Sequence, residues 1–405
     1  MDQSNSPGVA HGGALYIYPG KTAGRPSATT PARVDLAGAT TSLCLSTTGA
    51  APVRPHMVFF NQSHSHAILS FVASGHVVVF DAATRQPVAC ITSSPGAGGA
   101  RQAHAAFPSP DDSYILVANQ NGKLLERIDT DYRRGWFRLN PAAGINLATC
   151  STPAGAPCEG PEVRPDNAPI CPIVADDSRL AFVTLRGGGL FVVNARETPM
   201  RIVAEFDRAT VHGNGCGGVQ VGRSMFLDSG GGTGANMNEF DVYQFDLRAF
   251  RRTNVPNPPN APAPTLLFSE DQGNRDAHGM AVTRNGRYLW VADRSANLAE
   301  VFQTRTGQRL AVVPLVGPLS NDPTPDLVDV SPDGELLFVT LRGPTPLSGD
   351  PHVSTGSTPG LGVVRLHGHG RGGAMVAIHR ISNPDAGGIE RADPHGIRVR
   401  LTAGR

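Results

Sequence analysis

Histidine recurs at one position of a repeated pattern, and imidazole is the side chain that most often binds transition metals in proteins. In the stretch RDAHGMAVTRNGRYLWVADRS, residues 275–295, His278 stands directly before an alternating apolar run. The Asn285–Gly286 pair then predicts a tight hairpin turn into a second apolar run. A strand–turn–strand unit needs no histidine at its start, so His278 is a candidate functional residue.

The same strand–turn–strand unit recurs along the chain. Aligning the copies on their second strands places a repeated position in register with His278, occupied by His56, His104, Ile170, Asp326 and His395. His104 follows His56 by as many residues as Asp326 follows His278. A shorter copy begins near His212, where His212 and Asn214 are both candidates for this position.

The spacing of the copies predicts the architecture. Four-strand units repeating every ~40 to 60 residues are the signature of a β-propeller. We predict an all-β, seven-bladed β-propeller of four-stranded antiparallel blades, starting near residues 56, 104, 170, 212, 278, 326 and 395. The C-terminal PHGIRVRLTAGR supplies the inner strand of the last blade and ALYIYPG (14–20) the next, so strands from both termini close the ring. Residues 13–405 then form one domain, preceded by a flexible N-terminus at 1–12.

The hairpins also carry a family resemblance. Ser331–Gly334 reads SPDG and is followed by LFVT at Leu337–Thr340, and Ser109–Asp112 is followed by ILVA at Ile115–Ala118. These repeats resemble the YVTN-type seven-bladed propellers, a group with lactonase-like members that is related to the methylamine dehydrogenase heavy chain. The resemblance implies the fold and no catalytic residue, because such scaffolds host unrelated activities.

The repeated histidines predict a metal site on the propeller axis. The inner strands of a propeller line its channel, so side chains at one strand position converge at one height. The candidate ligands are His56, His104, His278, His395 and His212, and four of the 13 histidines occupy the repeat position. An all-imidazole site suits Fe or Cu redox chemistry, whereas Zn would suit a lyase or hydrolase in which Asp326 acts as the catalytic base. Channel histidines that hold only water are the structural alternative.

Two aspartates and three arginines are expected around this site. Asp276 and Asp393 each precede a histidine by two residues and would orient its imidazole as second-sphere acceptors. Arg186, Arg294 and Arg342 end second strands at corresponding positions. They suit either an anionic substrate or pairing with the nearby carboxylates.

Two long insertions, 141–169 and 343–360, are expected on the face where the histidines lie. Long loops in compact folds are usually functional or disordered, so these segments predict a lid or a substrate pocket. Cys150 and Cys158 flank a short Pro/Gly loop in the first insertion, where a disulfide and free thiols are both open.

Composition excludes some classes of function. A net charge of +1 gives no electrostatic case for nucleic acid or a membrane surface. No apolar run is long enough to predict a membrane span. Neither the six cysteines nor the polar N-terminus distinguishes a cytoplasmic protein from a trimmed periplasmic or secreted one.

Taken together, the residues predict a metal-dependent oxidoreductase acting on a small organic, anionic substrate. The alternatives are a Zn-dependent lyase or hydrolase, and a non-catalytic propeller that binds a partner through its loop-rich face. The substrate, the metal and the oligomeric state are not determined by the sequence.

Overall fold

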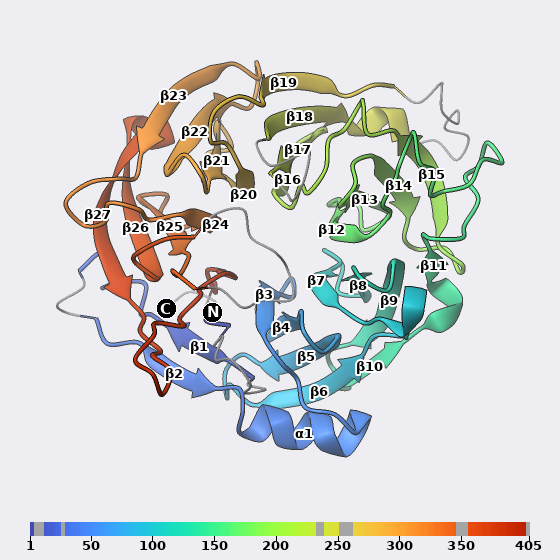
Figure 1. The fold of residues 1–405 in the computed structure, drawn as a ribbon, viewed down its shortest axis with the longest axis horizontal. Helices are drawn as coiled ribbons and strands as arrows, with labels where there is room; N and C mark the ends of the chain where they lie inside the picture. The colour runs from blue at the N-terminus through green and yellow to red at the C-terminus, as the bar shows by residue number, and fades with distance from the viewer. Residues whose placement is uncertain (4–11, 26–28, 232–238, 251–261, 346–354, 402–405) are drawn as a thin grey trace.

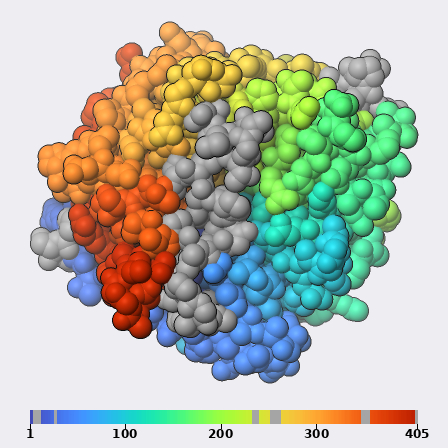
Figure 2. Space-filling view, in the orientation of Figure 1, coloured from blue at the N-terminus to red at the C-terminus, as the bar shows by residue number. Residues whose placement is uncertain are grey.

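The computed structural model describes residues 1–3, 12–25, 29–231, 239–250, 262–345 and 355–401. Its sheets are arranged in a ring around a central axis, and the chain visits them in order (Figure 1). The space-filling view shows the blades as successive coloured sectors (Figure 2). The predicted β-propeller is confirmed.

Six of the seven described sheets have a path of four antiparallel strands, with the first strand of each nearest the axis (Figure 1). In blades one to three these are β3 (Pro55–Phe60), β4 (His66–Phe71), β5 (His76–Asp81), β6 (Pro87–Thr92); β7 (Ala103–Pro108), β8 (Tyr114–Asn119), β9 (Leu124–Asp131), β10 (Trp136–Leu139); β12 (Pro169–Val174), β13 (Leu180–Leu185), β14 (Leu190–Asn194), β15 (Arg201–Phe206). In blades four to six they are β16 (Gly218–Val221), β17 (Ser224–Gly230), β18 (Phe240–Asp246), β19 (Thr265–Glu270); β20 (Ala277–Val282), β21 (Tyr288–Asp293), β22 (Leu298–Gln303), β23 (Arg309–Pro314); β24 (Pro325–Val330), β25 (Leu336–Leu341), β26 (Gly360–His367), β27 (Gly372–Arg380).

The seventh blade is built from both ends of the chain. β1 (Ala14–Ile17) pairs with β2 (Ala32–Asp35), and Asp2 forms antiparallel bridges to Ala14 on one side and to Pro394 on the other. The order across the blade is therefore Pro394, Asp2, β1, β2. Closure by both termini is as predicted, but Met1–Gln3 belong to the blade, whereas the sequence placed residues 1–12 outside it. Residues 4–11 lie outside the described part.

Local sequence explains the blades. The Asn285–Gly286 turn joins β20 to β21, and Gly286 has φ +70°, a conformation that glycine adopts without a steric penalty. The side chains of a middle strand point alternately to the two faces of its blade. Both faces are buried, as in β13, because each blade packs against two neighbouring blades. Phe182 of blade three meets Phe245 of blade four edge-to-face, with ring centroids 5.4 Å apart.

Helical structure is sparse in the described residues. The one α-helix there, α1 (Ala39–Thr48), lies outside β6 (Figure 1). Short 3₁₀ turns occur at Ala97–Gly99, Pro141–Ala143, Leu247–Phe250 and Gly368–Gly370. None of these described helices is long and apolar enough to cross a membrane.

The first insertion is packed onto the ring. Its β11 (Ile145–Asn146) pairs with β9, and Ala143, Ile145 and Leu147 are buried in the core shared by blades two and three. The Cys150–Cys158 disulfide, one of the two states left open by the sequence, is present. This packing fixes most of 141–169 in place instead of leaving a free lid. Of the second insertion, residues 346–354 lie outside the described part.

Candidate functional site: a ring of ligand side chains on the axis

A β-bulge at the start of each full inner strand aims the site residues. In blade one Pro55 pairs with Phe71 and Met57 with Ser70, so His56 is the extra residue. Equivalent register shifts follow Ala103, Pro169, Ala277 and Pro325. Bulges re-aim side chains and are common beside active sites. The repeated position is therefore the point where each inner strand turns side chains into the channel.

The structure brings the four repeat-position histidines together. The imidazoles of His56 and His395 stack with centroids 3.8 Å apart, and His278 lies edge-on to His395 at 5.5 Å. The Nε2 atoms of His56 and His104 are 3.2 Å apart. All four side chains are buried, so four blades deliver imidazoles to one enclosed volume.

Backbone carbonyls orient two of these rings. His104 Nδ1 lies 2.9 Å from the carbonyl oxygen of Ile170, and His395 Nδ1 lies 3.0 Å from that of His56. A carbonyl only accepts, so each Nδ1 carries a proton, which leaves Nε2 as the nitrogen that can bind a metal ion. This is how proteins usually fix a metal-binding imidazole.

Asp326 completes this side of the site. Its carboxylate lies 3.2 Å from His278 Nε2 and 3.7 Å from His395 Nε2, and it receives a 2.5 Å hydrogen bond from Arg342 Nη1. Burial alone would raise its pKa, but His278, Arg342 and Arg294 outweigh burial and hold the pKa of Asp326 well below its usual range. Asp326 is thus a buried, permanently ionised carboxylate among imidazoles.

The expected second-sphere aspartates bind the arginines. Asp393 forms a two-point pair with Arg342, each contact 2.7 Å, and Asp276 forms one with Arg294 at 2.6 and 3.0 Å. Arg342 and Arg294 are almost fully buried. These arginines therefore bridge carboxylates and steady Asp326, which is the pairing alternative considered from the sequence.

Arg186 lies apart from that network. It donates to Asp166 at 2.6 Å, and 37% of its side chain is exposed. Of the three expected arginines it is the one that is open to solvent.

His212 is placed differently from the other candidate ligands. Blade four starts at Gly218 and not near His212, whose Nδ1 instead lies 2.7 Å from Glu239 and 2.6 Å from Asp241. Hydrogen bonds from Asp241 and Glu239 raise the pKa of His212 to about 10, so its imidazole is protonated near neutral pH. With Glu239 and Asp241, His212 forms a separate group of three possible ligand atoms that lie within 4.8 Å of one another.

Two cysteines from blades three and four lie beside the aligned position of the inner strands. Cys171 follows Ile170 in the bulge of β12, and Cys216 precedes β16 by two residues. A nitrogen of His104 and the Sγ atoms of both cysteines lie within 4.8 Å of one another, and the cysteines form a disulfide. The sequence alignment did not reveal them because Cys171 stands one residue after the aligned position, Ile170, and because blade four had no fixed register. The available signal was the pair of cysteines near the two blade starts without histidine.

Every blade therefore contributes one ligand-type side chain to what we call the axial ring. In chain order its members are His56, His104, Cys171, Cys216, His278, Asp326 and His395. One half is rich in imidazole and carboxylate, and the other half is rich in sulfur.

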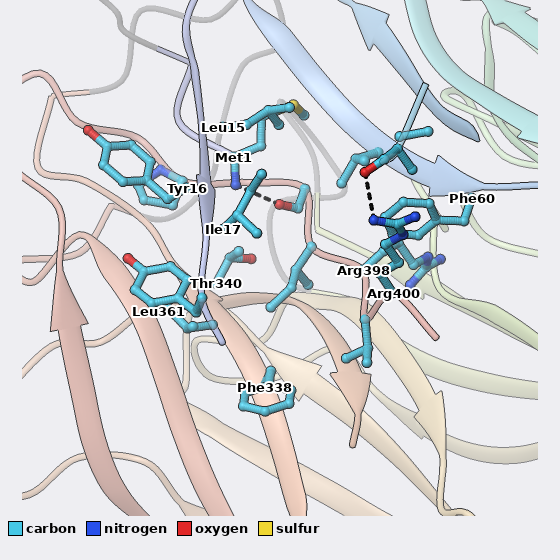
Figure 3. A pocket seen from close by; sticks show the side chains of 18 of the residues that line it. Met1, Leu15, Tyr16, Ile17, Phe60, Phe338, Thr340, Leu361, Arg398 and Arg400 are labelled. Carbon is cyan, nitrogen blue, oxygen red and sulfur yellow. Dashed lines mark hydrogen bonds between the residues drawn. The ribbon is translucent and has the colours of Figure 1, made fainter. Parts of the chain in front are cut away.

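An apolar cavity of about 290 Å³ lies behind the ring, in the seventh blade. Leu15, Tyr16 and Ile17 of β1 form one wall, and Phe60 and Phe338 come from the blades on either side (Figure 3). Its lining includes Pro394 and Gly396, which flank His395, but none of the ring's imidazoles. The cavity thus approaches the backbone of the site and not its ligand atoms.

Comparison with known proteins identifies the fold. No protein-family profile and no curated protein sequence matches the chain. Hydrazine synthase from Kuenenia stuttgartiensis is 14% identical with a TM-score of 0.54, over 77% of this chain and 76% of that one. A putative 6-phosphogluconolactonase from Bacteroides fragilis is 11% identical with a TM-score of 0.54, over 94% of each chain. A protein from Lactobacillus plantarum is 12% identical with a TM-score of 0.56, over 80% and 84%. At these identities the likeness shows the β-propeller fold alone.

Proposed function

We propose that this β-propeller is a metal-dependent oxidoreductase whose transition-metal ion is held on the axis by imidazole Nε2 atoms of His56, His104, His278 and His395. The observation that carries the proposal is the convergence of these four buried rings from four different blades. A cation between the rings would be shared by imidazoles from four blades.

The local charge supports a cation. Asp326 is a buried carboxylate in direct contact with the imidazoles of His278 and His395. A divalent ion would be attracted strongly in such an enclosed, low-dielectric place.

The contacts of Asp326 suit the role of ligand or counter-charge. Its carboxylate accepts from Arg342 and lies against the imidazoles of His278 and His395. Imidazole binds Cu and Fe as well as Zn. We propose Cu or Fe, which would supply one-electron chemistry, and the metal analysis below distinguishes them from Zn.

The buried setting constrains the substrate. Each proposed histidine ligand is at most 4% exposed, so only a small molecule could reach an ion between them. Arg294 and Arg342 are taken up by carboxylates and would position Asp326 instead of binding the substrate. Of the three arginines proposed for an anionic substrate, Arg186 remains the one open enough to meet it.

Metal analysis tests the proposal directly. Untagged protein purified without chelator should contain about one Cu or Fe per chain by plasma mass spectrometry, and His278→Ala should lose most of it. His369→Asn is the matched control, because His369 is exposed in the turn after β26 and should leave the metal content unchanged.

The other outcomes of the metal analysis would support different functions. One Zn per chain, lost in His278→Ala, would overturn the redox assignment and favour a lyase or hydrolase. Wild-type protein that stays metal-free after reconstitution with each ion would refute the metal site altogether. That result would favour a non-catalytic propeller that binds a partner through its loop-rich face.

A further inference from the structure

We propose that the sulfur-rich half of the axial ring is a second, redox-gated metal site: when the Cys171–Cys216 disulfide is reduced, the two thiolates and the thioether of Met57 bind Cu(I). This inference goes beyond the proposed function, with which it shares no ligand. It concerns residues that the histidine pattern did not reveal.

The donor atoms are already gathered. Met57 Sδ lies 3.9 Å from Cys171 Sγ and 4.0 Å from Cys216 Sγ. A nitrogen of His104 and both Sγ atoms fall within 4.8 Å of one another. All four side chains are less than 5% exposed. Three sulfur donors thus surround one small volume, with the imidazole of His104 beside it.

The backbone holds both cysteines independently of the S–S bond. The Thr184 hydroxyl accepts from the Cys171 amide at 3.1 Å and donates to the carbonyl of Gly215 at 2.5 Å. On the other side, Asp228 Oδ1 accepts from the amides of Cys216 and Gly217 at 3.1 and 2.8 Å. Opening the disulfide would therefore leave both thiols in place.

The donor set selects the metal. Thiolate and thioether ligands are soft and favour Cu(I) over harder ions. Zn also binds thiolates, but it rarely takes a thioether as a ligand. Met57 in contact with both Sγ atoms therefore favours Cu(I).

A dithiol can reduce the Cys171–Cys216 disulfide. Thiol–disulfide exchange transfers two electrons and two protons from the dithiol, which becomes a disulfide, to Cys171 and Cys216. Binding of Cu(I) then displaces the two thiol protons to solvent. In the reverse exchange a small-molecule disulfide takes two electrons from the thiolates and two protons from solvent and becomes a dithiol, which re-forms the Cys171–Cys216 bond and releases the ion.

The test compares copper binding in the two redox states. Protein treated with dithiothreitol under anaerobic conditions, then freed of it, is titrated with Cu(I) supplied as a chromophoric chelator complex. Reduced wild type should take up one more Cu(I) per chain than oxidised protein, and X-ray absorption should show sulfur ligands. Cys171→Ser and Cys216→Ser should each lose the additional ion.

Two controls separate this site from others. Cys44→Ala/Cys90→Ala removes a different buried disulfide and should still gain the ion on reduction. His278→Ala disables the proposed histidine site and should also still gain it, so the two sites can fail separately. Three results would each overturn the proposal: no additional ion in reduced wild type, an additional ion without sulfur ligands, or a Cys171–Cys216 bond that dithiothreitol does not reduce in the folded protein.

Discussion

At the scale of single residues, the site depends on charges that are buried in pairs. Arg342 is fully buried between Asp326 and Asp393, and such pairs are expensive to break because one partner is left charged and unsolvated. The network keeps Asp326 ionised beside the imidazoles. His212 forms a separate ion-paired group with Glu239 and Asp241.

His212 should make stability depend on pH. Its pKa is raised from 6.5 to about 10 by Asp241 and Glu239, so its contribution is complete below pH 6.5 and is lost as the pH rises to about 10. His212→Asn should therefore lower the melting temperature most near pH 6.5 and little near pH 10. Thermal melts of both proteins across this range measure the difference.

His369→Asn provides the comparison, since His369 is exposed in a turn and the change keeps a residue suited to its positive φ. A His212→Asn effect that stays constant from pH 6.5 to pH 10 would argue against the ion pair.

At the scale of elements, the disulfides fix parts that the strand ladders do not. Cys44–Cys90 fastens α1 to β6, and Cys150–Cys158 closes a short loop within the first insertion. A cross-link restricts the unfolded chain more when it closes a longer loop. The sequence separations are 46 and 8 residues.

The two disulfides should therefore differ in their effect on stability. In the chain-entropy picture Cys44→Ala/Cys90→Ala should lower the free energy of unfolding by roughly 4 kcal/mol, and Cys150→Ala/Cys158→Ala by roughly 2.5 kcal/mol. Urea denaturation of the two double variants and the wild type gives both values. A larger loss from the shorter loop would show that local packing, and not loop closure, decides the outcome.

At the scale of the whole molecule, the ring is closed at Asp2, which pairs with Ala14 on one side and with Pro394 on the other. The Asp2 amide donates to the carbonyl of Ala14 at 2.9 Å, and the Asp2 carboxylate accepts from the amide of Asp393 at 2.8 Å. The same closure carries His395 into the channel. Stability and the proposed site are thus joined at this blade.

Asp2→Pro should weaken the closure. Proline removes the amide donor and leaves the Ala14 carbonyl unsatisfied, which should cost about 1–3 kcal/mol in urea denaturation. Asp2→Asn, which keeps the amide and a side-chain acceptor, is the control and should cost less. Equal losses in the two variants would assign the effect to the carboxylate charge instead of the strand pairing.

The sequence by itself determined the blades and the imidazoles. Apolar alternation, Asn-Gly and SPDG turns and a regular spacing are local properties, and they repeat strongly enough to place His56, His104, His278 and His395 at one strand position. Because a propeller converts a repeated position into a ring, their meeting follows from the pattern. The Cys150–Cys158 disulfide could also be considered from the sequence, because the two cysteines are close in the chain.

Only the tertiary structure decided the rest of the axial ring. Cys171 and Cys216 join it through a bulge and through the irregular entry to blade four, neither of which has a local sequence signature. Met1–Gln3 and the pairing of Arg294 and Arg342 with Asp276, Asp326 and Asp393 likewise depend on segments that meet only when the ring closes. Side-chain contacts between blades have no fixed sequence separation, so they become readable only once the chain has folded.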